Sequence, residues 1–577
     1  MIDCPLPGGR QAVTLYDTTL RDGSQREGAS LTVADKLRIA AKLDALGIDY
    51  IEGGFPASNP LDNEFYRQAA SLGLGHAALS AFGTTAHKGT RPQDDAGLAA
   101  LVACPAPVVT LLGKAWAAQA VEVLGTSAEE NLRTIGLSVR YLVEAGKRVF
   151  LDAEHFFDSY KDDPAYALAV LAAAEQAGAE ALVLCDTNGG TLPHEVYEIT
   201  KAAVEAVGAR GAGVSPTSRA AEVSAAVETT PALRATPPKE GNVDAATAAG
   251  GARGRGTAIG IHVHDDAGCA VASSLEAVRA GATQVQGTIN GFGERVGNAN
   301  LVTVAANLQL KMGYEVLAPE RLALLTQVAH LVSETFNVTP DAHLPYVGQN
   351  AFSHKGGIHA SASLRCRRAY EHIDPALVGN FSRIVVSELA GRASLAAKAQ
   401  ELGVALPADE GRVQALLDTV KLREAQGYSY EAADASLALL LRAQQGEAPT
   451  YFVLESFRVL VEKREDGRAM SEATIKLLVD GERHVATGEG NGPVNALDAA
   501  LRLAIRRFYP QVEGFELTDY KVRVLDESTG TGAVTRVLIE TSDGQTSWGT
   551  VGVSENVIEA SWDALVEAMA YGLLKKR

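Results

Sequence analysis

Basic residues are in short supply in this chain of 577 residues. The 52 Lys and Arg residues are outnumbered by 70 Asp and Glu residues, which gives a formal net charge of −18 at pH 7. Because nucleic acids and anionic membranes are bound by clustered Lys and Arg, this charge argues against both partners. The sequence also lacks an apolar run of about 18 residues, and its first residues lack a basic segment followed by an apolar one. We therefore expect a cytoplasmic protein.

Cysteine is also scarce, and the five cysteines are Cys4, Cys104, Cys185, Cys269 and Cys366. They show no Cys-x-x-Cys spacing, which excludes a zinc site built from thiolates and is typical of a reducing compartment. We interpret all five as small buried apolar side chains. Two of them, Cys185 and Cys269, lie in the sequence beside candidate site residues.

The chain alternates strand and helix patterns from residue 13 to about residue 312, as repeated βα units do. The predicted strands are 13–17, 50–53, 77–81, 108–112, 149–152, 182–185, 259–263 and 284–288. The amphipathic segments between them include 32–46, 128–144, 164–177 and 269–280. Eight strands, each followed by a helix, predict a closed (β/α)8 TIM barrel of the α/β class as a catalytic domain over residues 1–312.

One segment interrupts the barrel pattern. Residues 208–256 are rich in Ala, Gly, Thr, Ser and Pro and contain almost no large apolar side chains. Such a composition cannot bury a core, so we interpret this segment as a surface insertion and assign it no function.

Two further regions follow the barrel. Residues 313–448 show mainly helical patterns around the polar stretch 350–359, which predicts a linker that can place side chains over the barrel mouth. Residues 449–577 contain an internal repeat, in which Gly488, Ala500 and neighbouring residues recur 64 residues later. In each copy strands lead through a glycine turn into a helix, so we expect a pseudo-symmetric α+β domain.

Two histidines stand two residues apart at the end of an apolar strand pattern. A His-x-His pair by itself is often only a hydrogen-bonded pair, but His262 and His264 share one face of the predicted strand. Asp22 and Asn298 follow the first and the eighth predicted strands, which are neighbours in a closed barrel. We therefore predict that Asp22, His262, His264 and Asn298 bind one divalent ion, Mn²⁺, Zn²⁺, Mg²⁺ or Co²⁺.

Four protein ligands leave room for a 2-oxo acid to bind such an ion through its carboxylate and keto oxygens, which would polarise the keto carbon. Arg21 is a candidate to stabilise the alkoxide that forms when a carbanion adds, or to form an ion pair with Glu52 or Glu294, and both roles are compatible. Glu154 and Thr187 also follow predicted strands. Thr187 is a candidate donor to the substrate carboxylate and Glu154 a candidate base or water-positioning group, with support of neighbouring site residues as the alternative.

Five ordered motifs carry a family resemblance. They are residues 20–25, 262–265, 291–298, 353–359 and 488–494. Together they resemble the family of 2-isopropylmalate, homocitrate and citramalate synthases over nearly the whole chain outside residues 208–256. Residues 53–60 and 150–158 are most similar to the citramalate synthase branch.

The resemblance implies an acyltransferase that condenses acetyl-CoA, its co-substrate, with pyruvate and water to give citramalate and CoA for isoleucine biosynthesis. The implied residues are Asp22, His262, His264 and Asn298 for the metal, Arg21, Asp22, Thr187 and His262 for the substrate, and Arg21, Glu154, His359 and Tyr370 for catalysis. His359 and Tyr370 would help to deprotonate acetyl-CoA from the linker.

The C-terminal repeat is similar to the family's regulatory domain, which binds an end-product amino acid at a dimer interface. The resemblance therefore implies a homodimer with isoleucine as its effector. Residues 488–492 and 552–556 are predicted loops at the corresponding places of the two copies, either for contact with the effector or as ordinary helix entry turns.

Other functions stay open. The same chemistry acts on 2-oxoisovalerate in 2-isopropylmalate synthases and on 2-oxoglutarate in homocitrate synthases, and a pocket discriminates single methylenes by only about 10- to 200-fold. A related metal-dependent lyase is disfavoured because we find no glycine-rich loop with a cysteine near the barrel mouth. A non-catalytic amino-acid sensor is disfavoured by the intact metal and arginine positions.

Overall fold

The computed structural model describes residues 11–211, 257–355, 357–385, 391–463, 465, 469–525 and 533–576. The chain divides into two compact units. The N-terminal unit comprises Met1–Ala351 and Ile373–Phe381, and the C-terminal unit comprises Phe352–His372 and Ser382–Arg577. The segment after the barrel therefore contributes residues to both units.

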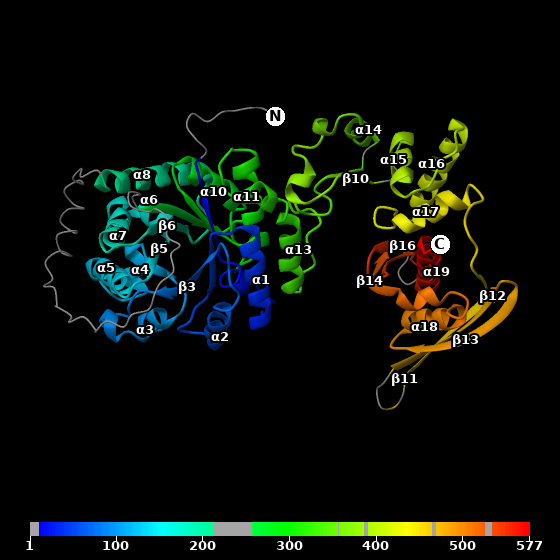
Figure 1. The fold of residues 1–577 in the computed structure, drawn as a ribbon, viewed down its shortest axis with the longest axis horizontal. Coiled ribbons are helices and arrows are strands. Elements are labelled where there is room, and N and C mark those ends of the chain that lie inside the picture. Colours follow the sequence, from blue (N-terminus) through cyan, green and yellow to red (C-terminus); the bar gives the residue numbers. More distant parts are fainter. Residues whose placement is uncertain are drawn as a thin grey trace. The chain divides into compact units, whose positions relative to one another are not determined.

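A closed barrel of eight parallel strands forms the centre of the N-terminal unit (Figure 1). The strands are β1 (Thr14–Asp17), β2 (Tyr50–Gly54), β3 (Ala78–Thr84), β4 (Val108–Lys114), β5 (Arg148–Glu154), β6 (Ala181–Asp186), β7 (Ala258–Val263) and β8 (Gln284–Gly287). Strand β1 closes the ring by pairing with β8, with Thr14 opposite Gln284 and Asp17 opposite Gly287. The predicted (β/α)8 barrel is confirmed.

Five of these strands run further than the sequence predicts, β2 and β6 by one residue and the other three by two or three. Strands β3, β4 and β5 end at Thr84, Lys114 and Glu154. In β4 and β5 the backbone ladder continues past the apolar run, and Lys114 pairs with Glu154 at its end. Hydropathy therefore located the strands and missed their carboxyl ends.

Helices surround the barrel, as the βα pattern predicts (Figure 1). They are α1 (Val33–Leu46), α2 (Pro60–Ala69), α3 (Ala96–Ala103), α4 (Ala117–Glu122), α5 (Ala128–Glu144), α6 (Phe156–Asp162), α7 (Pro164–Gln176), α8 (Pro193–Gly211), α10 (Ala270–Arg279), α11 (Leu301–Leu310), α12 (Pro319–Leu322) and α13 (Leu325–Thr335). Helix α1 begins at a capping box of Thr32 and Asp35 and ends at Gly47, whose φ is +96°.

Two expectations from the sequence need correction. Helix α8 extends to Gly211, so residues 208–211 continue the helix and do not begin an insertion; residues 212–256 lie outside the described residues. Cys104 and Cys185 are buried as expected, but Cys269 is partly exposed and Cys366 is exposed. Both of these stand at helix N-caps, where a side chain need not face the core. Cys4 lies outside the described residues.

The C-terminal unit begins with a mainly helical region, as predicted. Its elements are β9 (Ser353–His354), α14 (Gly357–Arg365), β10 (Arg383–Ile384), α15 (Arg392–Glu401), α16 (Glu410–Ala425) and α17 (Asp434–Ala443). Two three-stranded antiparallel sheets follow, each completed by one helix. The first copy is β11 (Val453–Lys463), β12 (Ala469–Val479), β13 (Glu482–Gly490) and α18 (Pro493–Ile505), and the second is β14 (Glu516–Val524), β15 (Thr535–Ser542), β16 (Ser547–Ser554) and α19 (Val557–Lys575). The predicted repeat is confirmed.

The repeated glycines let a helix pass close over the third strand of each sheet. A Cβ atom at Gly488 would lie 2.5 Å from the backbone nitrogen of Ala500 in α18. A Cβ atom at Gly552 would lie 1.9 Å from the carbonyl oxygen of Ala560 in α19. Close helix packing therefore requires glycine at both positions.

The predicted loops of the repeat are shorter than expected. Residues 488–490 belong to β13 and residues 552–554 belong to β16, so only the last two residues of each predicted loop form the turn into the helix. The glycine-rich composition reflects helix contact along the strand, which a sequence pattern cannot distinguish from a turn.

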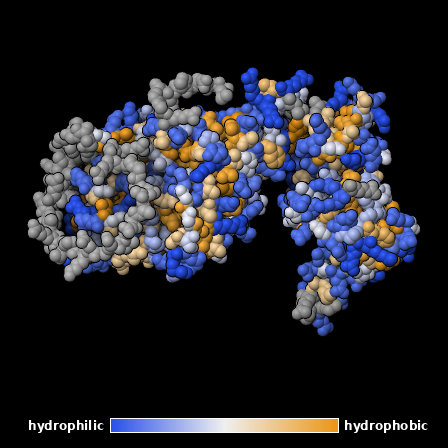
Figure 2. All heavy atoms as spheres, in the orientation of Figure 1, coloured by the Kyte–Doolittle hydropathy of each residue, from blue (hydrophilic) through white to orange (hydrophobic). Residues whose placement is uncertain are grey.

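Hydrophilic and hydrophobic residues are mixed on the face drawn in Figure 2. Among the described residues, the structure contains no helix that is both long and apolar enough to cross a bilayer.

Candidate active site

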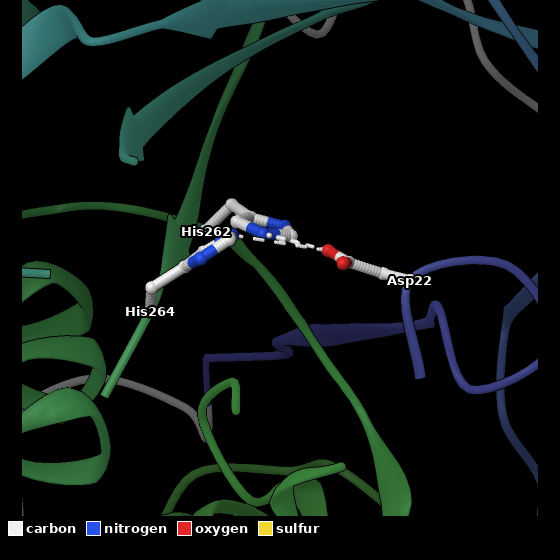
Figure 3. Close-up of side chains that lie close together, drawn as sticks. All are labelled: Asp22, His262 and His264. Atoms are coloured by element: carbon white, nitrogen blue, oxygen red, sulfur yellow. Dashed lines mark ion pairs between the residues drawn. The ribbon is translucent and has the colours of Figure 1, made fainter. Parts of the chain in front are cut away.

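Asp22 and two histidines converge at the carboxyl ends of β1 and β7 (Figure 3). The Nε2 atom of His262 lies 3.3 Å from Oδ2 of Asp22, and the Nε2 atom of His264 lies 3.9 Å from the same oxygen. All three side chains are buried. Ligands of one ion at about 2.1 Å lie roughly 3 to 4 Å from each other, so this spacing fits a shared divalent ion.

Asn298 stands beside His264, joined to it by an antiparallel β-bridge. Its Nδ2 donates to the carbonyl oxygen of Phe292 at 3.1 Å, whereas its Oδ1 is buried with no hydrogen-bond partner among the described residues. A buried amide oxygen is costly to leave unpaired, and a metal ion would satisfy it. Gly297 makes the preceding turn possible, because its φ is +101° and a Cβ atom there would lie 1.9 Å from Gly291 O.

The electrostatics of the cluster keep Asp22 ionised and His264 neutral, whereas for His262 burial is outweighed by the contact with Asp22, which raises its pKa above the ordinary value. Burial alone would raise the pKa of Asp22, but the charge of Arg21 and the contact with His262 outweigh burial and lower that pKa below its ordinary value. Burial, reinforced by the charge of His262, lowers the pKa of His264 to about 4. At neutral pH the site therefore presents the carboxylate of Asp22, the form that ligates metals, and a neutral imidazole at His264.

Arg21 is held in place on three sides. Its Nε lies 2.5 Å from Oε2 of Glu52, its Nη1 lies 3.6 Å from Asp22, and its guanidinium carbon lies 3.9 Å from the ring centroid of Phe82. The ion-pair partner is thus Glu52, one of the two acids that the sequence proposes. Such fixation suits a group that must stabilise charge without reorganising.

Thr187 and Glu154 lie at the barrel mouth after β6 and at the end of β5. The backbone N–H of His155 donates to Oγ1 of Thr187 at 2.9 Å. Since this contact uses an acceptor position, the single hydroxyl proton of Thr187 is left to donate elsewhere. Glu154 forms an ion pair with Lys114 at the end of β4. Sequence reasoning missed Lys114, because the apolar pattern of its strand ends before it.

Arg295 is a second residue that sequence reasoning missed, although it stands inside the motif 291–298. Its guanidinium donates to Nδ1 of His264 at 2.8 Å, to the carbonyl oxygen of Thr187 at 2.9 Å and to Oδ1 of Asp266 at 2.7 Å. With Arg295 donating to Nδ1, the neutral His264 carries its proton on Nε2. Ligation of an ion through Nε2 therefore requires this proton to move and the contact with Arg295 to break.

The predicted linker pair lies in the C-terminal unit. The rings of His359 and Tyr370 have centroids 4.5 Å apart and are tilted by 31°. Both side chains are exposed. The structure thus places these two residues side by side within their own unit.

Three family models match successive parts of the chain. The model described as HMGL-like matches residues 12–215 and 252–332, and the homocitrate synthase post-HMGL domain-like model matches residues 346–427. The model of the LeuA allosteric (dimerisation) domain matches residues 431–573.

Curated relatives match almost end to end. The (R)-citramalate synthase of Aquifex aeolicus is 47% identical over 98% of this chain and 98% of its own length. The (R)-citramalate synthase of Sulfolobus acidocaldarius is 41% identical over 98% of this chain and 97% of its own length. A probable 2-isopropylmalate synthase of Methanopyrus kandleri is 30% identical over 96% of this chain and 97% of its own length.

A closed (β/α)8 barrel with a buried Asp–His–His cluster at the carboxyl ends of its strands defines a barrel enzyme with a candidate metal centre. The near end-to-end matches narrow this class further. The chain belongs to the (R)-citramalate synthase family.

Proposed function

We propose that the chain condenses acetyl-CoA with pyruvate and water to give (R)-citramalate and CoA. The observation that carries the proposal is the buried cluster of Asp22, His262 and His264, which lies beside Arg21 in a chain of this family. Relatives named (R)-citramalate synthase are 41–47% identical to the chain. Those named probable 2-isopropylmalate synthase are 27–30% identical, which favours pyruvate over 2-oxoisovalerate as the acceptor.

We assign Asp22, His262, His264 and Asn298 as the ligands of a divalent ion. The donor set of two imidazoles, one carboxylate and one amide oxygen suits Mn²⁺, Zn²⁺, Mg²⁺ or Co²⁺. When bound, such an ion supplies a Lewis acid that polarises the keto group of the substrate. The buried, unpartnered Oδ1 of Asn298 supports the fourth ligand.

The protein side chains orient the acceptor and stabilise the developing charge. The hydroxyl of Thr187 donates a hydrogen bond to the pyruvate carboxylate. As the acetyl methyl carbon, after losing a proton, bonds to the keto carbon, the keto electron pair moves onto oxygen, and Arg21 stabilises that negative charge. Water then attacks the thioester carbonyl, the C–S bond breaks and CoA leaves. We assign Glu154 the positioning of this water and acceptance of its proton.

We further assign His359 and Tyr370 to deprotonation of the acetyl methyl group. The support is the family resemblance of their motif together with the close, tilted arrangement of the two rings in the C-terminal unit. An imidazole beside a phenol is a suitable proton acceptor near neutral pH.

The C-terminal region belongs to a domain type that is allosteric and dimerising. We propose that the chain forms a homodimer and that isoleucine is its effector, because citramalate formation starts a route to that amino acid. Isoleucine at increasing concentration should lower the initial rate while leucine has a weaker effect. Equal inhibition by both amino acids, or by neither, contradicts this assignment.

Steady-state release of CoA, measured separately with pyruvate, 2-oxoisovalerate and 2-oxoglutarate, tests the proposed reaction. We expect kcat/KM for pyruvate to exceed the other values by about tenfold or more. Asp22→Asn, which removes one charged ligand, serves as the inactive control. A higher kcat/KM with 2-oxoisovalerate would refute pyruvate as the acceptor. If none of the three acids supports CoA release, the proposed condensation is refuted.

A further inference from the structure

Gln286 links a proposed metal ligand to a buried acid inside the barrel. Its Oε1 lies 3.0 Å from Nδ1 of His262 on the neighbouring strand β7. Its Nε2 donates to Oδ1 of Asp152 on β5 at 3.1 Å. Gln286 is fully buried, and His262 and Asp152 are 5% and 2% exposed. Solvent is thus excluded as an alternative partner for this amide.

The amide of Gln286 determines which atom donates and which accepts in each of these hydrogen bonds. Because Nε2 of Gln286 donates to Asp152, its Oε1 is the atom that faces His262. An amide oxygen only accepts hydrogen bonds, so Nδ1 of His262 must carry the ring proton. When the ring is neutral, its lone pair is then on Nε2, the atom that lies 3.3 Å from Asp22. In this tautomer the nitrogen that faces the cluster is the one available to a metal ion.

We propose that Gln286, oriented by Asp152, is a positioning residue that fixes the tautomer and ring orientation of His262 for metal binding. This inference rests on the metal centre proposed above and adds a residue to it that is not itself a ligand. Partners of this kind typically change metal affinity or activity by about 10- to 100-fold when they are removed. Gln286 therefore sets the tautomer and orientation of the His262 ring already in the metal-free protein.

The same strand supplies a matched control. Gln284 stands two residues earlier on β8, on the same face, and is 3% exposed. Its Oε1 has no hydrogen-bond partner among the described residues. Gln284→Met and Gln286→Met thus remove the same buried amide from neighbouring layers of the barrel, and only the second removes a contact with a proposed ligand.

Binding of Mn²⁺ alone, measured by isothermal titration to the full chain, tests the inference without relying on turnover. We expect Gln286→Met to weaken binding at least about tenfold, and Gln284→Met to leave the dissociation constant within about twofold of the parent protein. Gln286→Met within twofold of the parent protein would overturn the inference. Equal losses in both variants would also overturn it, because they would indicate a general effect of removing a core amide.

A paired exchange covers the case in which Gln286→Met does not fold. In Gln286→Glu with Asp152→Asn, the new carboxylate accepts from Nδ1 of His262 and the new amide donates to that carboxylate, so the direction of the contacts is kept. Binding of Mn²⁺ within about threefold of the parent protein supports the inference, and a loss of about tenfold or more overturns it. Asp22→Asn separates the two proposals. If the parent protein shows no Mn²⁺ binding that depends on Asp22, the metal centre itself fails, and the role of Gln286 fails with it.

Discussion

Replacing Thr187 by Val tests how the substrate carboxylate is held. The structure leaves the hydroxyl proton of Thr187 free to donate, because the backbone N–H of His155 already occupies an acceptor position at 2.9 Å. A hydrogen bond to a charged group contributes about 1.5–3 kcal/mol, and about 1.4 kcal/mol corresponds to a factor of ten. We therefore expect Thr187→Val to lower kcat/KM for pyruvate by roughly 10- to 150-fold.

Steady-state kinetics with each substrate varied in turn measure this effect. Thr187→Ser keeps the hydroxyl and should retain kcat/KM for pyruvate within about threefold of the parent protein, since the donor is preserved. The KM for acetyl-CoA should be nearly unchanged in both variants. The reasoning is refuted if Thr187→Val keeps its pyruvate kcat/KM within about twofold, or if Ser and Val variants lose equal activity.

Three further predictions concern charge, pH and packing. Arg21→Lys cannot reproduce the planar contacts with Glu52, so kcat should fall by about 100-fold or more in steady-state assays, and a value near that of the parent protein would contradict the role in charge stabilisation. Burial raises the pKa of Glu567 from 4.5 to about 7, so the folded state binds more protons than the unfolded state in this interval and stability falls as pH rises through it. Glu567→Gln should remove a pH-dependent loss of stability of at most about 3 kcal/mol, and less than this because the side chain is partly exposed. The variant should therefore lose less Tm than the parent protein between about pH 5 and pH 8, and an equal loss of Tm in both would contradict this prediction. Gly552→Ala forces a Cβ atom against a helix carbonyl and should destabilise the C-terminal unit by about 1–3 kcal/mol in thermal denaturation, whereas Gly514→Ala, which meets open space, should not; similar Tm values for the two variants would contradict the packing argument.

Much of the site could be predicted because eight consecutive βα units indicate a closed barrel. Once eight βα units are recognised, the first strand must lie beside the eighth, and Asp22 and Asn298 meet the two histidines although they are far apart in the sequence. The alternation of side chains along a strand places His262 and His264 on one face. These inferences need only periodicity and closure.

The partners of the site residues could not be predicted, because they depend on strand register and side-chain rotamers. The pairing of Lys114 with Glu154 follows from the register of β4 against β5, beyond the point where the apolar pattern ends. The choice of Glu52 over Glu294 as the partner of Arg21 depends on which acid faces the barrel interior. The contacts of Gln286 with His262 on β7 and Asp152 on β5 likewise cannot be deduced from the linear sequence.

Cys366 shows that the usual burial of a residue type does not determine the burial of a single side chain. Cys366 is exposed because it stands at the start of a short helical turn, although cysteine is usually buried. The repeated Gly488 and Gly552 are a second example, because their sequence pattern is read correctly as a repeat but incorrectly as loops. In both cases the local backbone context decides the environment of the side chain.

Identification of the product by mass spectrometry tests the central claim most directly. The full chain is incubated with Mn²⁺, acetyl-CoA and an equimolar mixture of pyruvate, 2-oxoisovalerate and 2-oxoglutarate, with Asp22→Asn as the matched control. We expect citramalate to be the main product of the parent protein and the control to form almost none. A main product derived from either of the larger acids, or equal citramalate formation by Asp22→Asn, would contradict it.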